Sequence, residues 1–290
     1  MDLLREIKKK TSAITEHDSL DSIKAAIRHV EVAERHFNRA RDEHEEDLFN
    51  DVIYRTNQAF EGMLKEAYTV LTSNDGNKLS PNQIEQHLIK EEVFASRVLE
   101  LFKNYRQQWR NPSAHDHKLF FSEQESLLAI VSVSAFANIL LDQIIEVINF
   151  KREQENVQAI KAQIQQTVQD SSSKPLYELL IALLKQFSSE LLSSIADPKV
   201  LSEVEIIGRL HGFLKSIDIS WTILREPSLK SGVIEAGNPR VLRPDLYVRR
   251  DDEAAIVEVK RAGFNKSTLE RGQIQLINYL EVSGLQHGIL

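Results

Sequence analysis

RPDLYVRRDDEAAIVEVKR, residues 243–261, is the stretch that decides the fold of the C-terminal part of the chain. Two runs in it, 245–250 and 254–261, are rich in alternating apolar residues, which is typical of β-strands. They are separated by an acidic turn, so the sequence predicts a β-hairpin with Asp251 and Asp252 at its tip. Each run also carries a carboxylate among apolar neighbours, where a hairpin should be packing its core.

The register of this hairpin brings two acids and one lysine together. With a two-residue turn, antiparallel pairing places Arg250 opposite Glu253 and, further from the turn, Asp245 opposite Glu258. Side chains alternate along a strand, so Lys260 lies on the same face as Glu258. The other face then points into a core through four apolar residues, Leu246, Val248, Val257 and Val259.

Two carboxylates that face each other on a sheet repel, unless water or a cation lies between them. A divalent metal satisfies both, and Mg²⁺ prefers carboxylates, waters and phosphate oxygens as ligands. A lysine two residues further on is placed to orient or deprotonate an attacking water, or to hold the phosphate. The residues therefore predict a Mg²⁺ or Mn²⁺ site on Asp245 and Glu258, assisted by Lys260.

Pro-Asp at 244–245, followed by Glu-Val-Lys at 258–260, resembles the signature of the PD-(D/E)XK nuclease superfamily, which has the restriction-endonuclease-like fold. The resemblance covers about residues 199–290. It implies an α/β domain with a central mixed sheet. It also implies that the two acids hold Mg²⁺ and that the lysine assists the water during phosphodiester hydrolysis.

Residues on two predicted helices extend this resemblance. Gln275 and Tyr279, on a helix at about 267–283, look like the Gln-x-x-x-Tyr element of one branch of the superfamily, in which both flank the metal site. The family also has a glutamate on the preceding helix, for which Glu203 and Glu205 both qualify. We favour Glu203 as a metal ligand, because apolar residues follow it on the same side of the helix. These residues are Ile206, Leu210 and Leu214.

The C-terminal elements follow the order helix, strand, strand, strand, helix, strand, which indicates a compact mixed α/β domain. The sequence predicts a helix over 202–216 and strands over 219–225 and 287–290. The segment GVIEAGNP, 232–239, suggests an extended loop between the first two strands. Since the chain stops at Leu290, inside an expected core strand, the last elements of the fold are expected to be missing or supplied differently.

Residues 1–150 are expected to form an all-helical domain, because apolar residues recur at helical spacing with little turn punctuation. A charged, Gln-rich stretch then predicts a helical connector over 151–198, before the α/β domain at 199–290. The expected helices lie near 18–46, 48–72, 80–108, 122–169 and 175–196.

Arg110 and His115, with Asn111 after the arginine, lie between two predicted helices, and this Arg-x4-His motif resembles the HEPN family of helical domains. In nuclease members the motif cleaves RNA without a metal. The histidine can move protons at the ribose 2′-OH and the leaving oxygen, and the arginine can stabilise the pentacoordinate phosphate. Paired motifs in the family imply a homodimer or higher oligomer. An ordinary helix-breaking turn at Asn-Pro-Ser is the alternative interpretation.

Length and composition limit the possible functions. A chain of 290 residues is long enough for two domains, and its net charge of −7 argues against non-specific coating of nucleic acid. Without cysteine there is no disulfide or thiolate metal site, which fits a reducing cytosol. The apolar run at 127–141 is shorter than the roughly 18 residues of a bilayer span. We therefore expect a buried helix in a soluble, cytoplasmic protein without a membrane partner.

These patterns lead us to expect a Mg²⁺-dependent nuclease that acts on DNA, with a helical domain that dimerises the chain or senses a ligand. Two nuclease-type modules on one chain suggest, by analogy, a prokaryotic antiviral defence effector. In a second hypothesis the HEPN-like motif is a metal-independent ribonuclease toxin and the C-terminal domain senses nucleic acid. In a third, the chain is a non-catalytic scaffold that recruits partners through helical surfaces.

Overall fold

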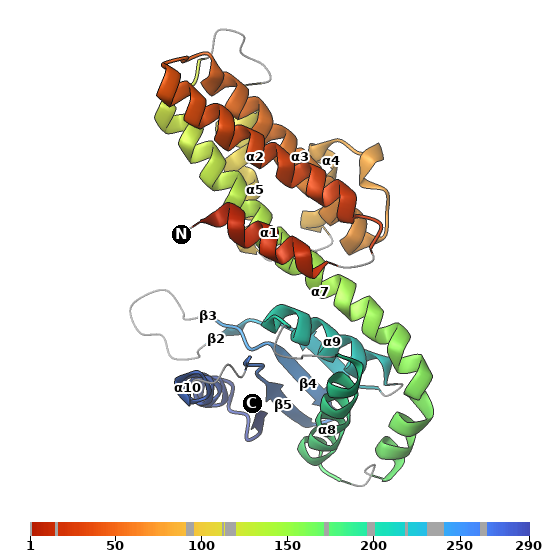
Figure 1. Ribbon diagram of the computed structural model, residues 1–290. Coiled ribbons are helices and arrows are strands. Elements are labelled where there is room, and N and C mark those ends of the chain that lie inside the picture. Colours follow the sequence, from red (N-terminus) through yellow and green to blue (C-terminus); the bar gives the residue numbers. More distant parts are fainter. Residues whose placement is uncertain are drawn as a thin grey trace. The chain divides into compact units, whose positions relative to one another are not determined.

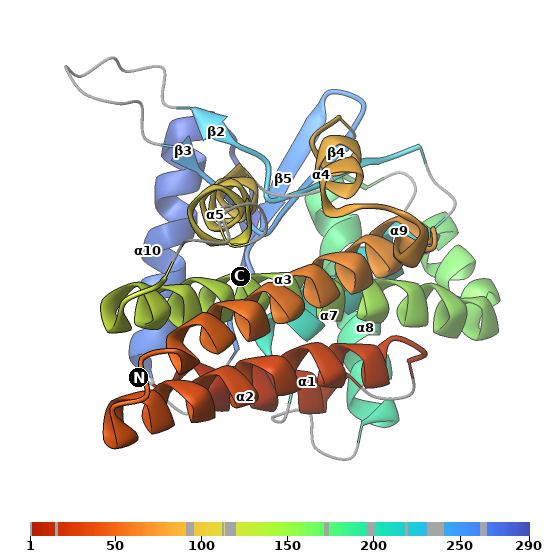
Figure 2. The same cartoon turned by 90° about the horizontal axis from the view of Figure 1, so that it is seen from above.

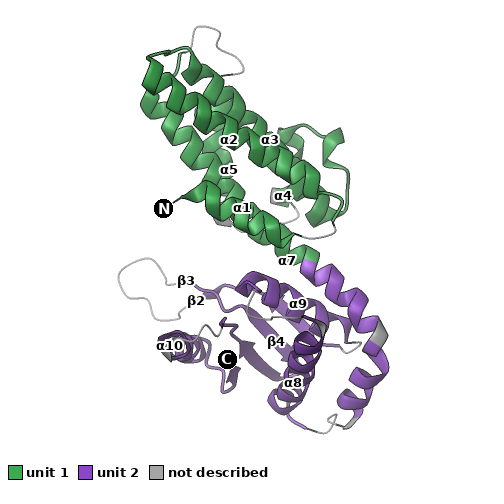
Figure 3. Cartoon of the chain, viewed as in Figure 1, with its two compact units in different colours: residues 1–148 green, residues 149–290 purple. Residues whose placement is uncertain are grey.

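The computed structural model describes residues 2–14, 17–90, 96–111, 113, 120–170, 174–195, 201–217, 220–230, 241–261 and 266–290. Over these residues the chain is mostly helical, with a small mixed β-sheet near its C-terminal end. It divides into two compact units, Met1–Ile148 and Asn149–Leu290 (Figures 1 and 3). A helical domain is thus followed by an α/β domain, as the sequence predicts.

The first unit is built from amphipathic helices that bury one stripe each. The long helices α2 (Leu20–Glu43) and α3 (Leu48–Thr72) pack side by side, as Figure 2 shows. A third long helix, α7 (Glu123–Asp170), begins in this unit and continues into the second. The shorter helical elements are α1 (Leu3–Ala13), η1 (Gly76–Lys78), α4 (Pro81–Lys90), α5 (Ser96–Tyr105) and the π-helical turn η2 (Arg106–Arg110).

Two of these helical elements differ from the expectation. The helix expected over 80–108 is divided, because α4 ends at Lys90 and α5 begins at Ser96. Helix α1 is not among the expected helices. The sequence of this short, lysine-rich segment nevertheless has a helical pattern, because its buried residues recur every three to four positions. The buried residues are Leu4, Ile7 and Thr11.

The most apolar stretch of the chain lies in α7. Within the described residues, Glu123–Gln158 is long and apolar enough to cross a membrane by length and composition alone. Most of its apolar window is buried inside the protein, however, and several large side chains are fully covered. These include Val133, Phe136, Leu140 and Ile144. This burial is consistent with a core helix of a soluble protein, as expected for 127–141.

The second unit contains a mixed sheet in the order β1-β4-β5-β6. Its strands are β1 (Thr222–Arg225), β4 (Leu246–Arg250), β5 (Glu253–Val257) and β6 (Gly288–Ile289). The pairs β1–β4 and β4–β5 are antiparallel, and β6 runs parallel to β5. The strand expected over 254–261 therefore ends earlier, at Val257.

Two further strands, β2 (Leu229–Lys230) and β3 (Val241–Leu242), pair with each other and were not expected. With two residues each, they are too short to show a period in the sequence. The loop expected at 232–239 falls outside the described residues.

The predicted hairpin register is confirmed along β4 and β5. Arg250 pairs with Glu253 next to the turn, and Leu246 pairs with Val257 at the other end of the ladder. At the tip, Asp251 has a φ of 51°, a left-handed conformation that Asp tolerates better than most residues. Residues on one face of the hairpin are buried as expected. They are Leu246, Val248 and Val257, with Val259 packed against them.

Helices cover both faces of this sheet. One face packs against α8 (Leu176–Ser194), α9 (Glu203–Ser216) and the C-terminal half of α7. The other face packs against α10 (Lys266–Ser283). Residues of the segment expected to be a connector, 151–198, belong to the first of these cores. They include Val157, Ile164, Leu180, Leu183 and Phe187.

Helix α9 approaches α7 closely at Gly212. A Cβ atom at Gly212 would collide with the backbone of Phe150. We expect Gly212→Ala to destabilise the protein by about 1–3 kcal/mol through overpacking, although alanine is the better helix former. Urea unfolding measures this effect, with Lys215→Ala on the exposed side of the same helix as control. A Gly212→Ala protein as stable as the control variant would contradict the close packing.

Candidate active site

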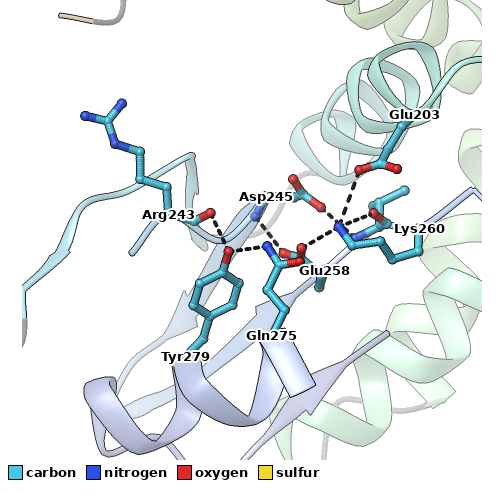
Figure 4. A network of polar contacts seen from close by, with 8 residues as sticks. Glu203, Arg243, Asp245, Glu258, Lys260, Gln275 and Tyr279 are labelled. Atoms are coloured by element: carbon cyan, nitrogen blue, oxygen red, sulfur yellow. Dashed lines mark hydrogen bonds and ion pairs between the residues drawn. The ribbon is translucent and has the colours of Figure 1, made fainter. Parts of the chain in front are cut away.

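Asp245 and Glu258 lie just beyond the ends of β4 and β5, on the face of the sheet that α10 covers (Figure 4). Beyond the last paired residues of β4 and β5, the two strands are joined by hydrogen bonds to these side chains. Glu258 Oε2 accepts a hydrogen bond from the Asp245 backbone N–H at 3.3 Å, and Asp245 Oδ2 accepts one from the Val259 N–H at 2.7 Å. The backbone of each strand therefore holds the carboxylate of the other, which fixes both acids where the strands separate.

Lys260 joins these acids to α9. Its Nζ donates to Glu258 Oε1 at 2.6 Å and to the Val259 carbonyl at 3.1 Å, and lies 3.4 Å from Glu203 Oε1. The Glu258 side chain is 1% exposed and the Lys260 side chain 16%, so water screens this pair little. Burial acts to lower the pKa of Lys260, but the hydrogen bond to Glu258 and the neighbouring acids outweigh it, and the pKa is raised.

The two glutamates near the start of α9 have different partners. Glu205 forms a capping box with Ser202: its Oε2 accepts from the Ser202 N–H at 2.8 Å and from the Ser202 hydroxyl at 2.7 Å. Glu203 instead faces Lys260. Of the two candidates, the structure therefore brings Glu203 to the acids. The Ser-x-x-Glu pattern at 202–205 is the sequence signal that separates them.

The electrostatics of the site suit a hard cation. Burial raises the pKa of Asp245 to about 7, and the Glu258 and Glu203 carboxylates add to this rise, against the Val259 amide and the Lys260 ammonium. Three acidic side chains thus surround one ammonium, and two of them, Asp245 and Glu258, are poorly solvated. A divalent cation relieves such an excess of negative charge, and carboxylate oxygens are the ligands that Mg²⁺ and Mn²⁺ prefer.

Asp245, Glu258 and Glu203 are therefore the residues that fit a metal. No group of three or more His, Cys, Asp or Glu side chains stands ready around a common point in the part of the chain that the structure describes. The acids of this site bond to backbone amides and to Lys260 instead.

Gln275 and Tyr279 lie one turn apart on α10 and bond to each other rather than to the acids. Gln275 Nε2 donates to Tyr279 Oη at 2.5 Å, and Tyr279 Oη donates to the Arg243 carbonyl at 2.9 Å. Burial raises the pKa of Tyr279, so its hydroxyl keeps its proton at neutral pH. The pair thus lies beside the acids but ends on the backbone two residues before Asp245 (Figure 4). No local sequence pattern indicates that the Arg243 carbonyl is the partner of Tyr279.

The other predicted motif is only partly described. Arg110 lies at the end of η2, where its Nε donates to Glu61 Oε1 on α3 at 3.1 Å. Its carbonyl accepts from the Ser113 hydroxyl at 3.1 Å, and Asn57 donates to that hydroxyl at 2.8 Å. His115 lies outside the described residues. The structure therefore adds Glu61 as a partner of Arg110. Local sequence patterns could not predict this contact, because the two residues are 49 positions apart.

Comparisons with protein-family models, with curated proteins and with solved structures found no match. No relative therefore supplies a family or an activity. The chemistry of the site rests on the residues and contacts described above.

The raised pKa of Asp245 predicts a pH dependence of stability. The folded protein keeps this proton up to about pH 7, whereas the unfolded chain loses it near pH 4, so unfolding releases a proton between these values. Stability should therefore fall as pH rises through this window. Asp245→Asn should remove that fall, measured by urea unfolding in metal-free buffer.

Asp252→Asn, in the exposed turn, is the matched control and should keep the wild-type pH profile. Parallel curves for the wild type and Asp245→Asn would show that Asp245 titrates in the folded protein as it does in the unfolded chain.

Proposed function

We propose that this protein is a metal-dependent nuclease of the restriction-endonuclease-like type, which hydrolyses phosphodiester bonds of DNA. The observation that carries this proposal is the gathering of Asp245, Glu258 and Lys260 at the point where β4 and β5 separate, with Glu203 reaching them from α9. An acid pair beside a lysine is the arrangement that the Pro-Asp and Glu-Val-Lys motifs suggest. Its burial and raised pKa values are typical of functional sites.

Each residue has a role in the proposed reaction. Asp245 and Glu258 hold a Mg²⁺ or Mn²⁺ ion, and Glu203 contributes a third carboxylate. A metal ion held by these residues would supply Lewis-acid chemistry at the scissile phosphate. Lys260, whose pKa is raised, enters as a protonated donor. It orients the attacking water or binds a non-bridging phosphate oxygen.

The wider assignment follows from the two units together. We propose that the first unit is a HEPN-like helical domain that dimerises the chain or senses a ligand. Two nuclease-type modules on one chain suit a prokaryotic antiviral defence effector by analogy.

A second candidate function uses the first unit. Arg110 is held by Glu61 beside a polar cluster of Asn57, Tyr105 and Ser113, an environment that orients a guanidinium for phosphate binding. With His115, Arg110 would form a ribonuclease that needs no metal, because the 2′-OH of RNA is the nucleophile.

Chelation and substitution separate these two functions. DNA cleavage by the first should disappear with EDTA and in Lys260→Ala, and should survive in His115→Ala. RNA cleavage by the second should survive EDTA and disappear in His115→Ala. If neither nucleic acid is degraded with Mg²⁺ or Mn²⁺, both enzymatic functions are wrong.

The two glutamates of α9 give a matched pair of variants for the nuclease. Glu203→Gln should slow DNA cleavage about 10- to 100-fold, because the metal loses a carboxylate. Glu205→Gln keeps an acceptor for the capping box and should cleave at close to the wild-type rate. Initial rates on a labelled DNA substrate measure the difference. Equal rates for the two variants would remove Glu203 from the site.

A further inference from the structure

The hydrogen bonds of α10 end on the segment that leads into the candidate active site. Tyr279 is 4% exposed and packs in a core with Ile256 and Leu276, so its hydroxyl is a fixed point. Gln275 donates to this hydroxyl, and the hydroxyl donates to the Arg243 carbonyl. The helix therefore anchors the backbone of Arg243.

The backbone on the other side of Arg243 is also held. Pro244 is buried, its ring fixes its own φ, and it restricts Arg243 to an extended conformation. Both backbone polar groups of Asp245 are hydrogen-bonded. Its N–H donates to Glu258, and its carbonyl accepts from the Glu226 N–H at 3.0 Å. Arg243 thus enters the site on a rigid stretch of chain, which is the condition for precise placement of its side chain.

The guanidinium of Arg243 has no partner among the residues that the structure describes. Figure 4 shows its side chain extending away from the acids, while its carbonyl faces Tyr279. Other arginines of this unit are engaged: Arg250 bonds to Glu253 at 2.6 Å, and Arg209 lies 3.7 Å from Glu153. An anchored arginine with a free, planar fork of donors is suited to bind a phosphate.

A further cation suits the charge around this site. The whole chain carries a net charge of −7, and a metal ion on the acids with Lys260 would at most balance Glu203, Asp245 and Glu258, so neither attracts a nucleic-acid backbone beyond the cleaved phosphate. Two residues of extended chain span about 7 Å, so Arg243 lies within one side-chain length of Asp245. A cation at this position attracts the strand.

We propose that Arg243 binds a backbone phosphate next to the cleaved one, and that Gln275 and Tyr279 are positioning residues that present it. This inference rests on the proposed nuclease function. In this inference, Gln275 and Tyr279 hold the Arg243 carbonyl and thereby position the Arg243 side chain for the substrate strand.

Substrate binding and its salt dependence test the role of Arg243. Arg243→Ala and the polar but uncharged Arg243→Gln should raise KM for a DNA duplex about 10- to 100-fold with little change in kcat, because a charge-assisted bond is lost in binding. The slope of log Kobs against log salt should become shallower by about one. Arg243→Lys should keep the slope. Arg249→Ala, at the exposed far end of β4, is the control and should match the wild type.

A double-variant cycle tests the positioning role. Tyr279→Phe keeps the ring in its core but removes the donor to Arg243, and it should raise KM in the wild-type background. In the Arg243→Ala background the same substitution should raise KM no further. Additive effects, with urea unfolding showing both variants folded, would mean that Tyr279 acts independently of Arg243.

The outcomes separate the inference from the function on which it rests. If the wild type cleaves DNA, and Arg243→Ala and Arg243→Gln keep both KM and the salt slope, the inference is wrong while the nuclease function stands. If the wild type neither binds nor cleaves DNA in Mg²⁺ or Mn²⁺, both are wrong.

Discussion

The ion pair between Lys260 and Glu258 is the contact on which the candidate site depends. Their atoms lie 2.6 Å apart, with the glutamate side chain almost wholly covered, so neither charge has water as a substitute partner. Removal of one partner leaves the other charged and buried, which is far more costly than loss of an exposed pair. Glu203 also approaches this lysine, from α9. Structure and chemistry are therefore coupled at Lys260, and a loss of activity in its variants has meaning only beside a measurement of folding.

The position of α9 depends in turn on its contacts with α7. Arg209 is buried against α7, where it bonds to Asn149 at 3.3 Å and lies 3.7 Å from Glu153. Gly212 permits the close approach of the two helices one turn later. The C-terminal half of α7 thus belongs to the α/β unit and supports the helix that carries Glu203. A charged, Gln-rich sequence suggested a connector, because its thin apolar stripe did not reveal how fully α8, α9 and the sheet would cover it.

Local patterns predicted much of the fold, and contacts between distant segments were beyond them. Alternation and turn chemistry were enough to give the hairpin register, and with it the shared position of Asp245 and Glu258. The choice between Glu203 and Glu205 could also be made from the sequence, because the capping box that engages Glu205 is a local pattern. Two other contacts could not be predicted, because tertiary packing brings distant residues together. Tyr279 and Arg243 are 36 positions apart, and Arg110 and Glu61 are 49 positions apart. The order of the longer helices and of the main sheet strands was predictable, whereas α1, the short strands β2 and β3, and the partners of individual polar groups were not.

The protonation state of Lys260 limits how the proposed reaction could begin. A lysine whose pKa is raised by neighbouring acids holds its proton at neutral pH, so it cannot accept one from water while it remains their counter-ion. The roles of counter-ion and general base exclude each other. A divalent cation on Asp245 and Glu258 would take over the first role, weaken the hold of the acids on the ammonium, and so lower its pKa. In the proposed reaction, a proton transfer to Lys260 would therefore have to follow the binding of a metal ion by Asp245 and Glu258.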